Sequence, residues 1–487
     1  MADLVIEKVN EVYLKIHTEP HVEYELRDRF TFEVPNMKFM PQYRKRHWNG
    51  EIHLFDIRTK RIYVGLLDKI VAFCEKSGYS YTFAKNKFYG LPFEVNEMVT
   101  PEGVKDFMAS ITALKPRDYQ IDAVSDALRY NRKLLISPTA SGKSFMIYTI
   151  VRFFVNAGKK ILLVVPTTSL VEQMFKDFQD YGWAAENHCH RIYAGRERVN
   201  TNEVTITTWQ SVYQLDRTFF EEYDVIIGDE AHLFKSKSLV GIMDKLHHAK
   251  YRYGFTGTLD GTQTHKWVLE GLFGPSYKVT GTKKLIDEGH LATLDIQCLV
   301  LKYKPKKFDT YEDEIQFLIG HEKRNNFIKN LAIDLKGNTL ILFSRVEAHG
   351  AILYNLINKN VSEGRKVFFV HGGVDAEDRE SVREITEQQK DAIIVASYGT
   401  FSTGINIKNL HNVIFASPSK SRIRNLQSIG RVLRKGKDKV SAKLYDIADD
   451  LTIGSRKNYT LNHFIERVKI YVQEEFNYDI VSIDIKD

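Results

Sequence analysis

The sequence contains few cysteines. Cys74, Cys189 and Cys298 are the only three among 487 residues, and they lie far apart without the spacing of metal ligands. Disulfide bonds that stabilise a fold are typical of small secreted domains, whereas isolated thiols are typical of a reducing compartment. The cysteine content therefore argues against a disulfide framework and against a cysteine-based metal site.

Long apolar runs and low-complexity segments are also missing. No run approaches the roughly 18 consecutive apolar residues that a membrane-spanning helix needs. The first residues, Met1 to Lys8, carry no apolar core of a secretion signal. We therefore expect a cytoplasmic protein without a membrane partner.

The composition favours a globular protein of several domains with a polyanionic partner. Apolar residues make up 43% of the chain, which is ample for buried cores. At roughly 150 residues a domain, the length predicts about three domains. The net charge of +7 and the isoelectric point of about 8.9 favour a polyanion as ligand.

Short β-like runs alternate with helical stretches through most of the chain, which predicts an α/β protein. This alternation is typical of parallel sheets covered by helices on both faces. We expect a small N-terminal α+β module, a linker, two lobes built on parallel sheets and a short C-terminal helical segment. Their expected bounds are 1–90, 91–113, 114–282, 283–450 and 451–487. The candidate strands are Leu134–Ile136, Ile161–Val165, Val204–Thr207, Val225–Ile227 and Arg252–Phe255 in the first lobe, and Leu340–Phe343, Val367–Val370, Ile393–Val395, Val413–Phe415 and Leu444–Ile447 in the second.

Three local patterns predict individual elements outside the lobes. Glu51–Phe55 and Arg61–Val64 flank a polar turn, which predicts a hairpin in the N-terminal module. Thr100 before Pro101 is typical of a helix N-cap followed by proline at the first helical position. In the tail, apolar residues at helical spacing predict a helix that packs on the body through Phe464, Val468 and Tyr471.

A basic and aromatic stretch in the N-terminal module is a candidate nucleic-acid contact. Arg44, Lys45 and Arg46 can neutralise phosphates, and Trp48 can stack on a base or sugar. The alternative is a solvated loop in which Trp48 is a buried core anchor and Asn49-Gly50 makes a turn.

A candidate phosphate-binding loop lies between two apolar runs, where a strand, a tight loop and a helix start are expected. Lys143 would reach the β- and γ-phosphates of a nucleotide, and the Ser144 hydroxyl would help to hold Mg²⁺. The strict pattern has glycine where this chain has Ser137, so a chance match in a surface loop is the alternative. The residues expected to bind the nucleotide here are Thr139, Ala140, Ser141, Gly142, Lys143 and Ser144.

Two acidic residues follow a second apolar run, Val225–Ile227. The carboxyl end of a buried parallel strand is where an α/β sheet opens to its ligand. We expect Asp229 to act on Mg²⁺ and Glu230 to orient or deprotonate the hydrolytic water. The alternative is a helix N-cap with a first-turn carboxylate.

A basic segment further along can supply positive charge to the γ-phosphate. On a helix, Gln427, Arg431 and Arg434 would share one face, because they are four and seven residues apart. Arginines presented in this way would complete a nucleotide site when the lobes close. The alternative is a basic helix on a solvated surface.

The order of these motifs resembles that of the superfamily-two helicases, over residues 114–435. Pro116–Gln120 resembles the adenine-reading element, with Arg117 and Gln120 beside the base. The remaining motifs are motif I at 137–144, a DEAH-type motif II at 229–232, motif III at 256–258, motif V at 402–406 and motif VI at 427–434. The resemblance implies two RecA-like lobes, with Gly404 and Asn406 of motif V near the nucleotide. Asn406 replaces an acid often found there, and Ala140 replaces a glycine.

The same resemblance implies a track for nucleic acid at the ends of several strands. Hydroxyl groups and N–H groups at such positions can contact the phosphates and sugars of a nucleic acid without reading its base sequence. Each of these residues alone is equally typical of a turn or a helix cap. The expected contacts are Thr167, Thr168, Thr208, Trp209, Gln210, Arg345, His371, Ser397 and Thr400.

Over nearly the whole chain the sequence is similar to the phage UvsW-type helicases. The similarity includes Phe39–Pro41, Trp48–Gly50, Ala396–Gly399, Phe401–Gly404 and Ile429–Lys435. It implies a monomeric ATP- and Mg²⁺-dependent DNA helicase that acts on single-stranded, forked or junction DNA in replication, recombination and repair, in the host cytoplasm. The alternatives are an RNA helicase, a restriction-type duplex translocase, and an ATP-gated clamp that grips DNA without unwinding it.

Overall fold

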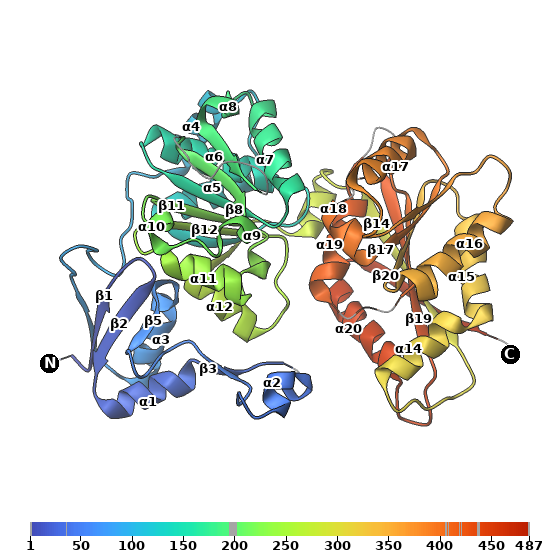
Figure 1. Cartoon of the computed structure of the whole chain (residues 1–487), viewed down its shortest axis with the longest axis horizontal. Coiled ribbons are helices and arrows are strands. Elements are labelled where there is room, and N and C mark those ends of the chain that lie inside the picture. The colour runs from blue at the N-terminus through green and yellow to red at the C-terminus, as the bar shows by residue number, and fades with distance from the viewer. Residues whose placement is uncertain are drawn as a thin grey trace. The chain divides into compact units, whose positions relative to one another are not determined.

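The chain divides into two compact units, Met1–Thr280 and Gly281–Asp487 (Figure 1). The structure is a computed structural model that describes residues 2–35, 37–193, 202–404, 407, 409–417, 419, 421–435 and 439–485. In that part of the chain, no helix has both the length and the apolar character needed to cross a membrane.

An N-terminal module, residues 2–84, opens the first unit. Its four-stranded sheet has the order β5-β2-β1-β6, in which β1 pairs antiparallel with β2 and parallel with β6. A separate two-stranded ladder, β3-β4, carries a basic arm, defined here as residues 34–50. The elements are β1 Leu4–Lys8, β2 Tyr13–Thr18, α1 Pro20–Arg29, β3 Thr31–Glu33, η1 Met37–Phe39, α2 Pro41–Arg44, β4 Glu51–His53, β5 Arg61–Tyr63, η2 Val64–Leu66, α3 Leu67–Ser77 and β6 Tyr81–Ala84.

The prediction of a hairpin between Glu51–Phe55 and Arg61–Val64 is wrong. Strand β4 pairs with β3, whereas β5 pairs with β2 in the other sheet. Only an isolated bridge between Asp56 and Arg61 joins the two runs. The two runs do flank a turn, but each has a better partner elsewhere, since pairing in a sheet is decided by the apolar face that each strand buries.

The first RecA-like lobe is a seven-stranded parallel sheet with the order β13-β7-β12-β11-β8-β10-β9. Its central strands are buried throughout, as expected for apolar runs in a sheet covered on both faces. The strands are β7 Arg132–Ile136, β8 Ile161–Val165, β9 Cys189–Ile192, β10 Val204–Thr208, β11 Val225–Asp229, β12 Tyr251–Thr256 and β13 Ser276–Lys278. The predicted strands are confirmed, and the two outermost, β9 and β13, were not predicted.

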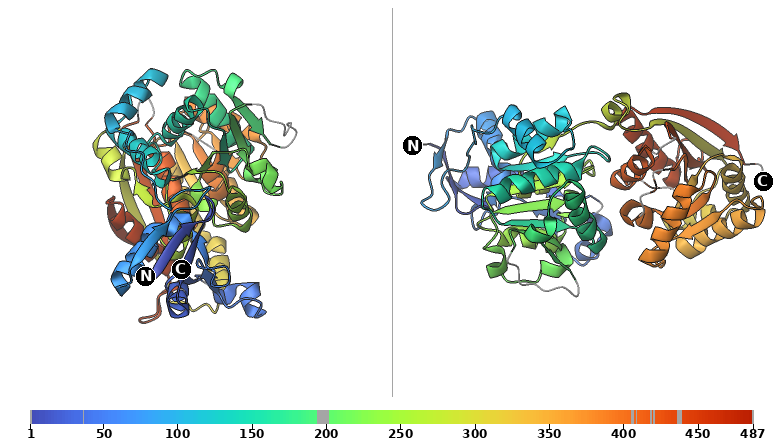
Figure 2. Two further views of the ribbon diagram at one scale, coloured as in Figure 1. Left: turned by 90° about the vertical axis from the view of Figure 1, so that its left-hand side faces the viewer. Right: turned by 90° about the horizontal axis from the view of Figure 1, so that it is seen from above.

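Helices cover both faces of this sheet (Figures 1 and 2). The predicted cap at Thr100 is confirmed, because its side chain accepts a hydrogen bond from the Gly103 amide at 3.1 Å. The helices are α4 Pro101–Ile111, α5 Asp118–Tyr130, α6 Lys143–Asn156, α7 Thr168–Asp180, α8 Ala185–His188, α9 Trp209–Val212, α10 Arg217–Phe220, η3 Ala231–Leu233, α11 Lys237–Lys245 and α12 Gln263–Phe273.

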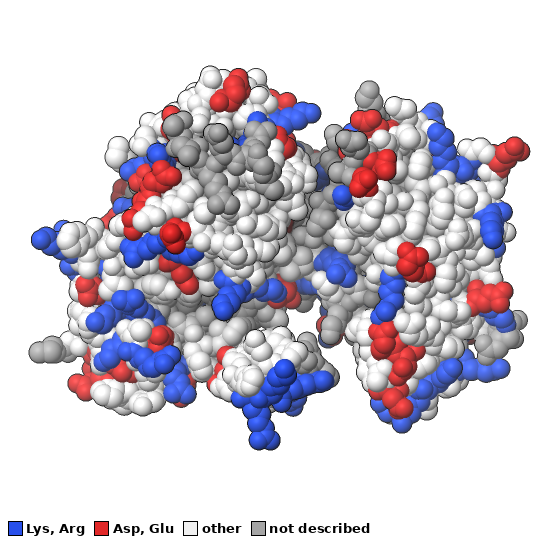
Figure 3. All heavy atoms as spheres, in the orientation of Figure 1, with Lys and Arg blue, Asp and Glu red and all other residues white. Residues whose placement is uncertain are grey.

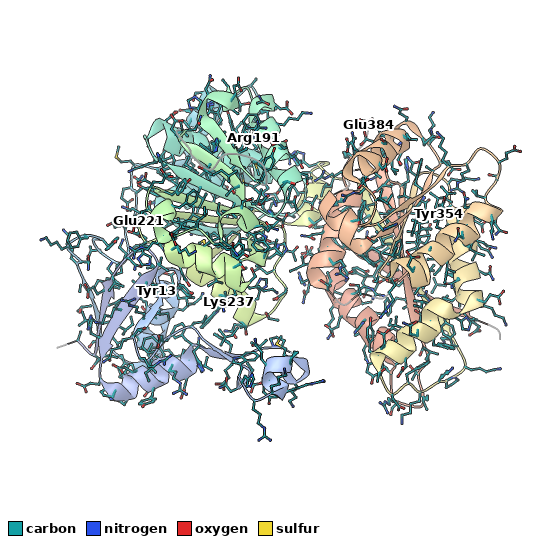
Figure 4. All side chains as sticks on the ribbon, viewed as in Figure 1. Tyr13, Arg191, Glu221, Lys237, Tyr354 and Glu384 are labelled. Atoms are coloured by element: carbon teal, nitrogen blue, oxygen red, sulfur yellow. The ribbon has the colours of Figure 1, made fainter. Side chains whose placement is uncertain are left out.

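The N-terminal module packs on α11 and α12 of this lobe. Trp267 of α12 lies in the apolar core of the module. Glu11 forms an ion pair with Arg132, with 3.0 Å between Oε2 and Nη2. The Tyr13 ring, labelled in Figure 4, stacks on Tyr63 with centroids 5.2 Å apart. Burial, then the nearby Asp244 carboxylate of α11, raises the pKa of both phenols well above the usual range. The module is therefore joined to the lobe by apolar, aromatic and charged contacts.

The second RecA-like lobe is another seven-stranded parallel sheet, with the order β16-β17-β15-β18-β19-β14-β20. The strands are β14 Thr293–Lys302, β15 Thr339–Phe343, β16 Val367–Val370, β17 Ile393–Ser397, β18 Asn412–Phe415, β19 Ser441–Asp450 and β20 Asn477–Asp484. The helices are α13 Thr282–Asp287, α14 Tyr311–Gly320, α15 Glu322–Asp334, η4 Val346–Gly350, α16 Ala351–Asn360, α17 Ala376–Gln388, α18 Tyr398–Gly404, α19 Arg422–Val432 and α20 Tyr459–Gln473.

The tail of the chain belongs to the structure of this second unit. The predicted helix is α20, which buries Phe464 and Tyr471 and leaves Val468 half-buried. Arg467 is fully buried and pairs with Asp446 of β19 at 2.8 Å. The strand after this helix, β20, pairs with β14, and neither strand was predicted. The tail thus extends the sheet as well as covering it.

Candidate functional site

Three sequence motifs follow strands that are neighbours in the first parallel sheet. The candidate phosphate loop follows β7, motif III follows β12, and motif II follows β11. Because carboxyl ends of parallel strands meet at one edge, the three loops lie side by side. The Ser137 amide donates to the Thr256 carbonyl at 2.8 Å, which joins the first two loops directly.

The phosphate loop has the backbone of an anion-binding turn at the start of a long helix. Gly142 has φ +83° and Lys143 begins α6. Ala140 also adopts a left-handed conformation, with φ +65°, where a residue with a Cβ costs about 1–2 kcal/mol. The replacement of glycine at this position is therefore a local strain. Ser137 has no such conformation, since it is not among the positive-φ residues.

Lys143 lies between the two motif II carboxylates. Its Nζ is 2.7 Å from Asp229 Oδ1 and 2.8 Å from Glu230 Oε1. Burial lowers the pKa of this lysine, but the two carboxylates more than offset that effect and raise the pKa above its usual value. Lys143 therefore stays charged. Burial opposes ionisation of Glu230 too, and the charges of Lys143 and His232 overcome it, so that the pKa of Glu230 is lowered.

Glu230 is held in a strained conformation by its neighbours. Its φ is +50°, and its amide donates to Asp229 Oδ1 at 2.8 Å. His232 Nδ1 lies 3.3 Å from Glu230 Oε2 and 3.1 Å from Thr256 Oγ1, so one imidazole contacts both motif II and motif III. Strained residues held by surrounding contacts are concentrated at functional sites.

The oxygen atoms at this edge fit a magnesium ion. Mg²⁺ prefers hydroxyl, carboxylate and water oxygens and is held by few protein ligands beside nucleotide phosphates. The Ser144 hydroxyl and the Asp229 carboxylate, expected to hold this ion, both belong to this edge. In the described residues, no group of three or more His, Cys, Asp or Glu side chains is arranged to hold a metal by itself. This donor set suits an ion that is shared with a nucleotide.

The residues expected to read adenine hold the phosphate loop. Gln120 Nε2 donates to the Ser141 carbonyl at 2.8 Å, and Arg117 Nη1 donates to the Ala140 carbonyl at 3.2 Å. A Cβ added at Gly142 would lie only 2.1 Å from Gln120 Nε2 and would displace that side chain, and the φ of +83° by itself favours glycine here. The contact of Arg117 and Gln120 with a base stays a prediction.

Two tyrosines at the loop were missed from the sequence. The Tyr119 hydroxyl donates to the Ser141 carbonyl at 3.2 Å, and its place beside Gln120 was a usable signal. The Tyr181 hydroxyl lies 3.0 Å from Ser144 Oγ. No local pattern indicates this second contact, because the two residues are 37 positions apart.

The nucleic-acid candidates of the first lobe follow the next two strands of the sheet. Thr167 and Thr168 come after β8, and Thr208 ends β10, with Trp209 and Gln210 at the start of α9. Thr167 is a helix N-cap that accepts from the Leu170 amide at 3.4 Å, as its alternative interpretation predicts. Gln210 is exposed. These residues occupy one half of the edge and the phosphate loop the other half.

The candidates of the second lobe also follow neighbouring strands, β16, β17 and β15. Arg345 follows β15 and pairs with Glu312 of α14. His371 follows β16, and its Nδ1 accepts from the Gly373 amide at 3.1 Å. Ser397 ends β17, with its hydroxyl 2.8 Å from that of Thr400. The structure therefore brings them to the carboxyl edge of one sheet.

The motif VI residues lie at the end of α19. Gln427 and Arg431 belong to the helix, which ends at Val432, so Arg434 follows the helix rather than lying on it. The expectation that all three share one helical face is wrong for Arg434. All three side chains are half-buried. Gly404 is the last residue of α18, and Asn406 lies outside the described residues.

The basic arm presents its cations to solvent. Arg44, Lys45 and Arg46 are exposed, and no acidic residue occurs between residues 37 and 50. Trp48 is half-buried outside the module's apolar core, and its Nε1 donates to the Glu51 carbonyl at 2.7 Å. A hollow of about 670 Å³ is lined by Lys38, Tyr43, Arg44, Arg46, His47, Trp48 and Asn49. Figure 3 shows the blue side chains gathered on the arm, at the bottom centre of the view.

Three family models match the chain. The family "DNA helicase UvsW, N-terminal" matches residues 4–84, "Type III restriction enzyme, res subunit" matches 113–261, and "Helicase conserved C-terminal domain" matches 322–436. The first corresponds to the N-terminal module, and the other two lie in the first and second lobes.

Individual relatives match most of the chain. The DNA 3'-5' translocase XPB2 of Sulfurisphaera tokodaii is 24% identical over 66% of this chain and 79% of its own. The crystal structure of phage T4 UvsW matches 99% of this chain and 100% of that one, with a TM-score of 0.52 and 30% identity. The ATP-dependent DNA helicase uvsW of Enterobacteria phage T4 is 33% identical over 97% of this chain and 98% of its own. The chain therefore belongs to the UvsW family of superfamily-two helicases.

Proposed function

We propose that the protein is an ATP-dependent DNA helicase that unwinds or branch-migrates forked and junction DNA in phage replication, recombination and repair. The observation that carries this proposal is the contact of Lys143 with Asp229 and Glu230 at 2.7 and 2.8 Å, at the sheet edge that follows β7, β12 and β11. A lysine, two acids and the start of a long helix are the groups that nucleotide hydrolysis requires there.

In the proposed reaction the nucleotide phosphates replace the carboxylates as the partners of Lys143. The loop amides and the positive end of α6 would bind the β-phosphate, while Arg117 and Gln120 would lie beside the base. Ser144 and Asp229 would hold Mg²⁺, which neutralises phosphate charge when bound. Glu230, whose Oε2 lies 3.3 Å from His232 Nδ1, would orient the attacking water and accept its proton.

The second unit would supply the remaining charge. Gln427, Arg431 and Arg434 are the residues in motif VI, and we infer that they act on the γ-phosphate when the lobes close. Gly404 and Asn406 would lie near the same nucleotide. Closing and reopening in each cycle would then change the grip of the strand-end residues on one DNA strand.

Two sets of residues would bind DNA in different ways. Thr167, Thr208 and Ser397 represent the short polar side chains at strand ends, which suit the phosphates of a single strand. The basic arm, with Arg44, Lys45, Arg46 and Trp48, suits the neighbouring duplex or the branch point. We propose that the protein acts as a monomer in the cytoplasm of the host cell.

The test compares the ATPase rate and strand displacement with four ligands: single-stranded DNA, duplex DNA, RNA and a four-way DNA junction. We expect DNA to stimulate the rate more than RNA, and the junction to be displaced or migrated. Stronger stimulation by RNA would favour an RNA helicase. Tight, ATP-dependent binding without displacement of any strand would favour a clamp, and equal stimulation by all four ligands would remove the preference for branched DNA.

A further inference from the structure

Helix α12, which no helicase motif includes, contacts two sites at once. Its first turn lies on the motif II loop, and its middle lies in the apolar core of the N-terminal module. The helix directly follows the loop that carries motif III. All of these contacts lie within the first compact unit.

His265 makes the contact at the nucleotide end. Its side chain is buried, and its Nε2 donates to the His232 carbonyl at 3.0 Å. Its Nδ1 lies 2.9 Å from Asp260 Oδ2. Since His232 itself contacts Glu230 and Thr256, His265 holds the backbone of the residue that orients the proposed catalytic carboxylate.

Trp267 makes the contact at the module end. Only 5% of this residue is exposed. The centroid of its ring lies 5.4 Å from the ring centroid of Phe30 and 5.1 Å from that of Phe32. The Arg29 guanidinium lies 5.0 Å from the centroid of the same ring. Phe32 is in β3, the strand that leads into the basic arm.

The packing between helix and module leaves little room for sliding. A Cβ added at Gly65 would lie 2.0 Å from the Glu270 carbonyl oxygen, so backbone lies against backbone there. On the same helix, a Cβ added at Gly271 would lie 3.1 Å from Tyr63. Because closely packed interiors switch between discrete arrangements instead of deforming gradually, a shift of α12 should move the N-terminal module with it.

We propose that α12 couples the nucleotide site to the basic arm, with His265 as the positioning residue at one end and Trp267 as the anchor at the other. A displacement of His232 on nucleotide binding shifts His265 and the helix, and Trp267 passes the shift to Phe32, β3 and the arm. This inference rests on the proposed binding of ATP at Lys143 and of junction DNA at the arm.

The experiment measures thermodynamic linkage. The affinity for a four-way junction is determined with and without a non-hydrolysable ATP analogue, and the affinity for the analogue with and without the junction. Coupling between two sites changes both affinities by the same factor, commonly about fivefold or more. We expect such a factor for the unmodified chain. Single-stranded DNA, held mainly at strand ends, serves as the second ligand for comparison.

Two substitutions at the nucleotide end separate coupling from folding. His265→Leu removes the donor to the His232 carbonyl, and we expect the junction linkage factor to fall to about one while linkage to single-stranded DNA persists. His265→Gln keeps an N–H at the same distance along the side chain and should restore most of the factor. Gln263→Leu, at an exposed position two residues earlier in the same helix, is the matched control and should leave the factor unchanged.

A pair at the module end tests the other contact. Trp267→Leu should reduce the linkage factor, and Trp267→Phe, which keeps an aromatic ring against Phe32, should retain it. Junction affinity without nucleotide reports whether the module is still folded in each variant. If Trp267→Leu loses that affinity, the linkage factors of His265→Leu and His265→Gln decide whether α12 couples the two sites.

The outcomes distinguish this inference from the proposed function. A full junction linkage factor in His265→Leu would overturn the coupling role of α12 and leave the helicase proposal intact. No linkage in the unmodified chain, although DNA still stimulates its ATPase, would overturn the inference in the same way. Absence of any DNA-stimulated ATPase would instead reject the proposed function on which it rests.

Discussion

At the scale of single residues, Lys143, Asp229 and Glu230 separate nucleotide turnover from DNA binding. We expect Glu230→Gln to lower the ATPase kcat by about 100-fold or more, because an amide cannot accept a proton from water. Lys143→Ala should also abolish turnover, because the nucleotide phosphates lose the positive charge that we propose binds them. Steady-state ATPase assays measure both effects.

The control for these two variants is DNA affinity, measured by fluorescence anisotropy. Neither residue lies in the basic arm or among the strand-end residues proposed to bind DNA, so affinity should change less than about threefold, within the range of a surface substitution. An active Glu230→Gln protein would remove that carboxylate from the mechanism.

A second residue-scale prediction concerns His349, which is buried in the second unit with its Nδ1 3.1 Å from Ser417 Oγ. Burial, together with the charge of Arg324, lowers its pKa from 6.5 to about 3. At a pH between the two pKa values, His349 binds a proton in the unfolded chain but not in the folded chain. The free energy of unfolding therefore falls as the pH drops through this window, by up to about 1.4 kcal/mol per pH unit.

His349→Gln should flatten this acid dependence. Urea unfolding between pH 6.5 and 4.5 measures the slope in both proteins, and only the slope matters, because the substitution also changes the absolute stability. Ser417→Ala, which removes the hydrogen-bond partner but keeps the imidazole, is the control and should retain the steep slope. Equal slopes for His349→Gln and the unmodified chain would show that another group causes the acid sensitivity.

At the scale of elements, the basic arm should determine affinity for branched DNA through its charge. Replacing Arg44, Lys45 and Arg46 together by glutamine should weaken junction binding at low salt. It should also reduce the slope of log affinity against log salt, by up to about 0.9 for each duplex phosphate that the arm no longer neutralises. Titrations at several salt concentrations measure both quantities.

A triple replacement of Arg58, Lys87 and Lys105 by glutamine is the matched control for the arm. These three residues are exposed cations in the same unit, so the net charge changes equally. The control should lower affinity only slightly. If both triple variants behave alike, the net charge of the unit rather than the arm determines binding.

Elements were predictable where one local signal was sufficient. Short apolar runs such as Ile161–Val165 in β8 and Val225–Ile227 in β11 are typical of buried parallel strands, and the motif residues that come after them lie at the carboxyl edge of the sheet. β13 and β20 were missed because they lie at sheet edges and bury few residues. The hairpin was predicted wrongly because the partner of β4, strand β3, lies outside the local sequence.

The same limit applies to the candidate site. The loops that carry Lys143, Asp229 and Glu230 were predicted from their own spacing, and the structure brings them together. The contacts of Tyr181 with Ser144 and of His265 with His232 join residues that are 37 and 33 positions apart. Such contacts depend on how helices pack on the sheet, and no periodicity in the sequence indicates them.

At the scale of the whole molecule, the burial of Trp267 makes the N-terminal module part of the folded first unit. Deleting residues 1–94 would expose this side chain, whose burial removes roughly 150–250 Å² of surface from water. At about 25 cal/mol per Å² that corresponds to about 4–6 kcal/mol of transfer free energy, as an upper estimate. We expect the truncated chain to have a lower Tm and to self-associate.

A substitution at Trp267 should then have opposite effects in the two chains. In the full chain Trp267→Thr opens a cavity between Phe30 and Phe32 and should lower Tm, because core truncations of this size cost about 3–5 kcal/mol. In the truncated chain the same change replaces an exposed apolar ring with a polar group and should restore a monodisperse protein. Thermal denaturation and size-exclusion chromatography of the four proteins measure both effects. A decrease in Tm of the same size in both chains would mean that the module contributes nothing to the burial of this helix, and that the two parts fold independently.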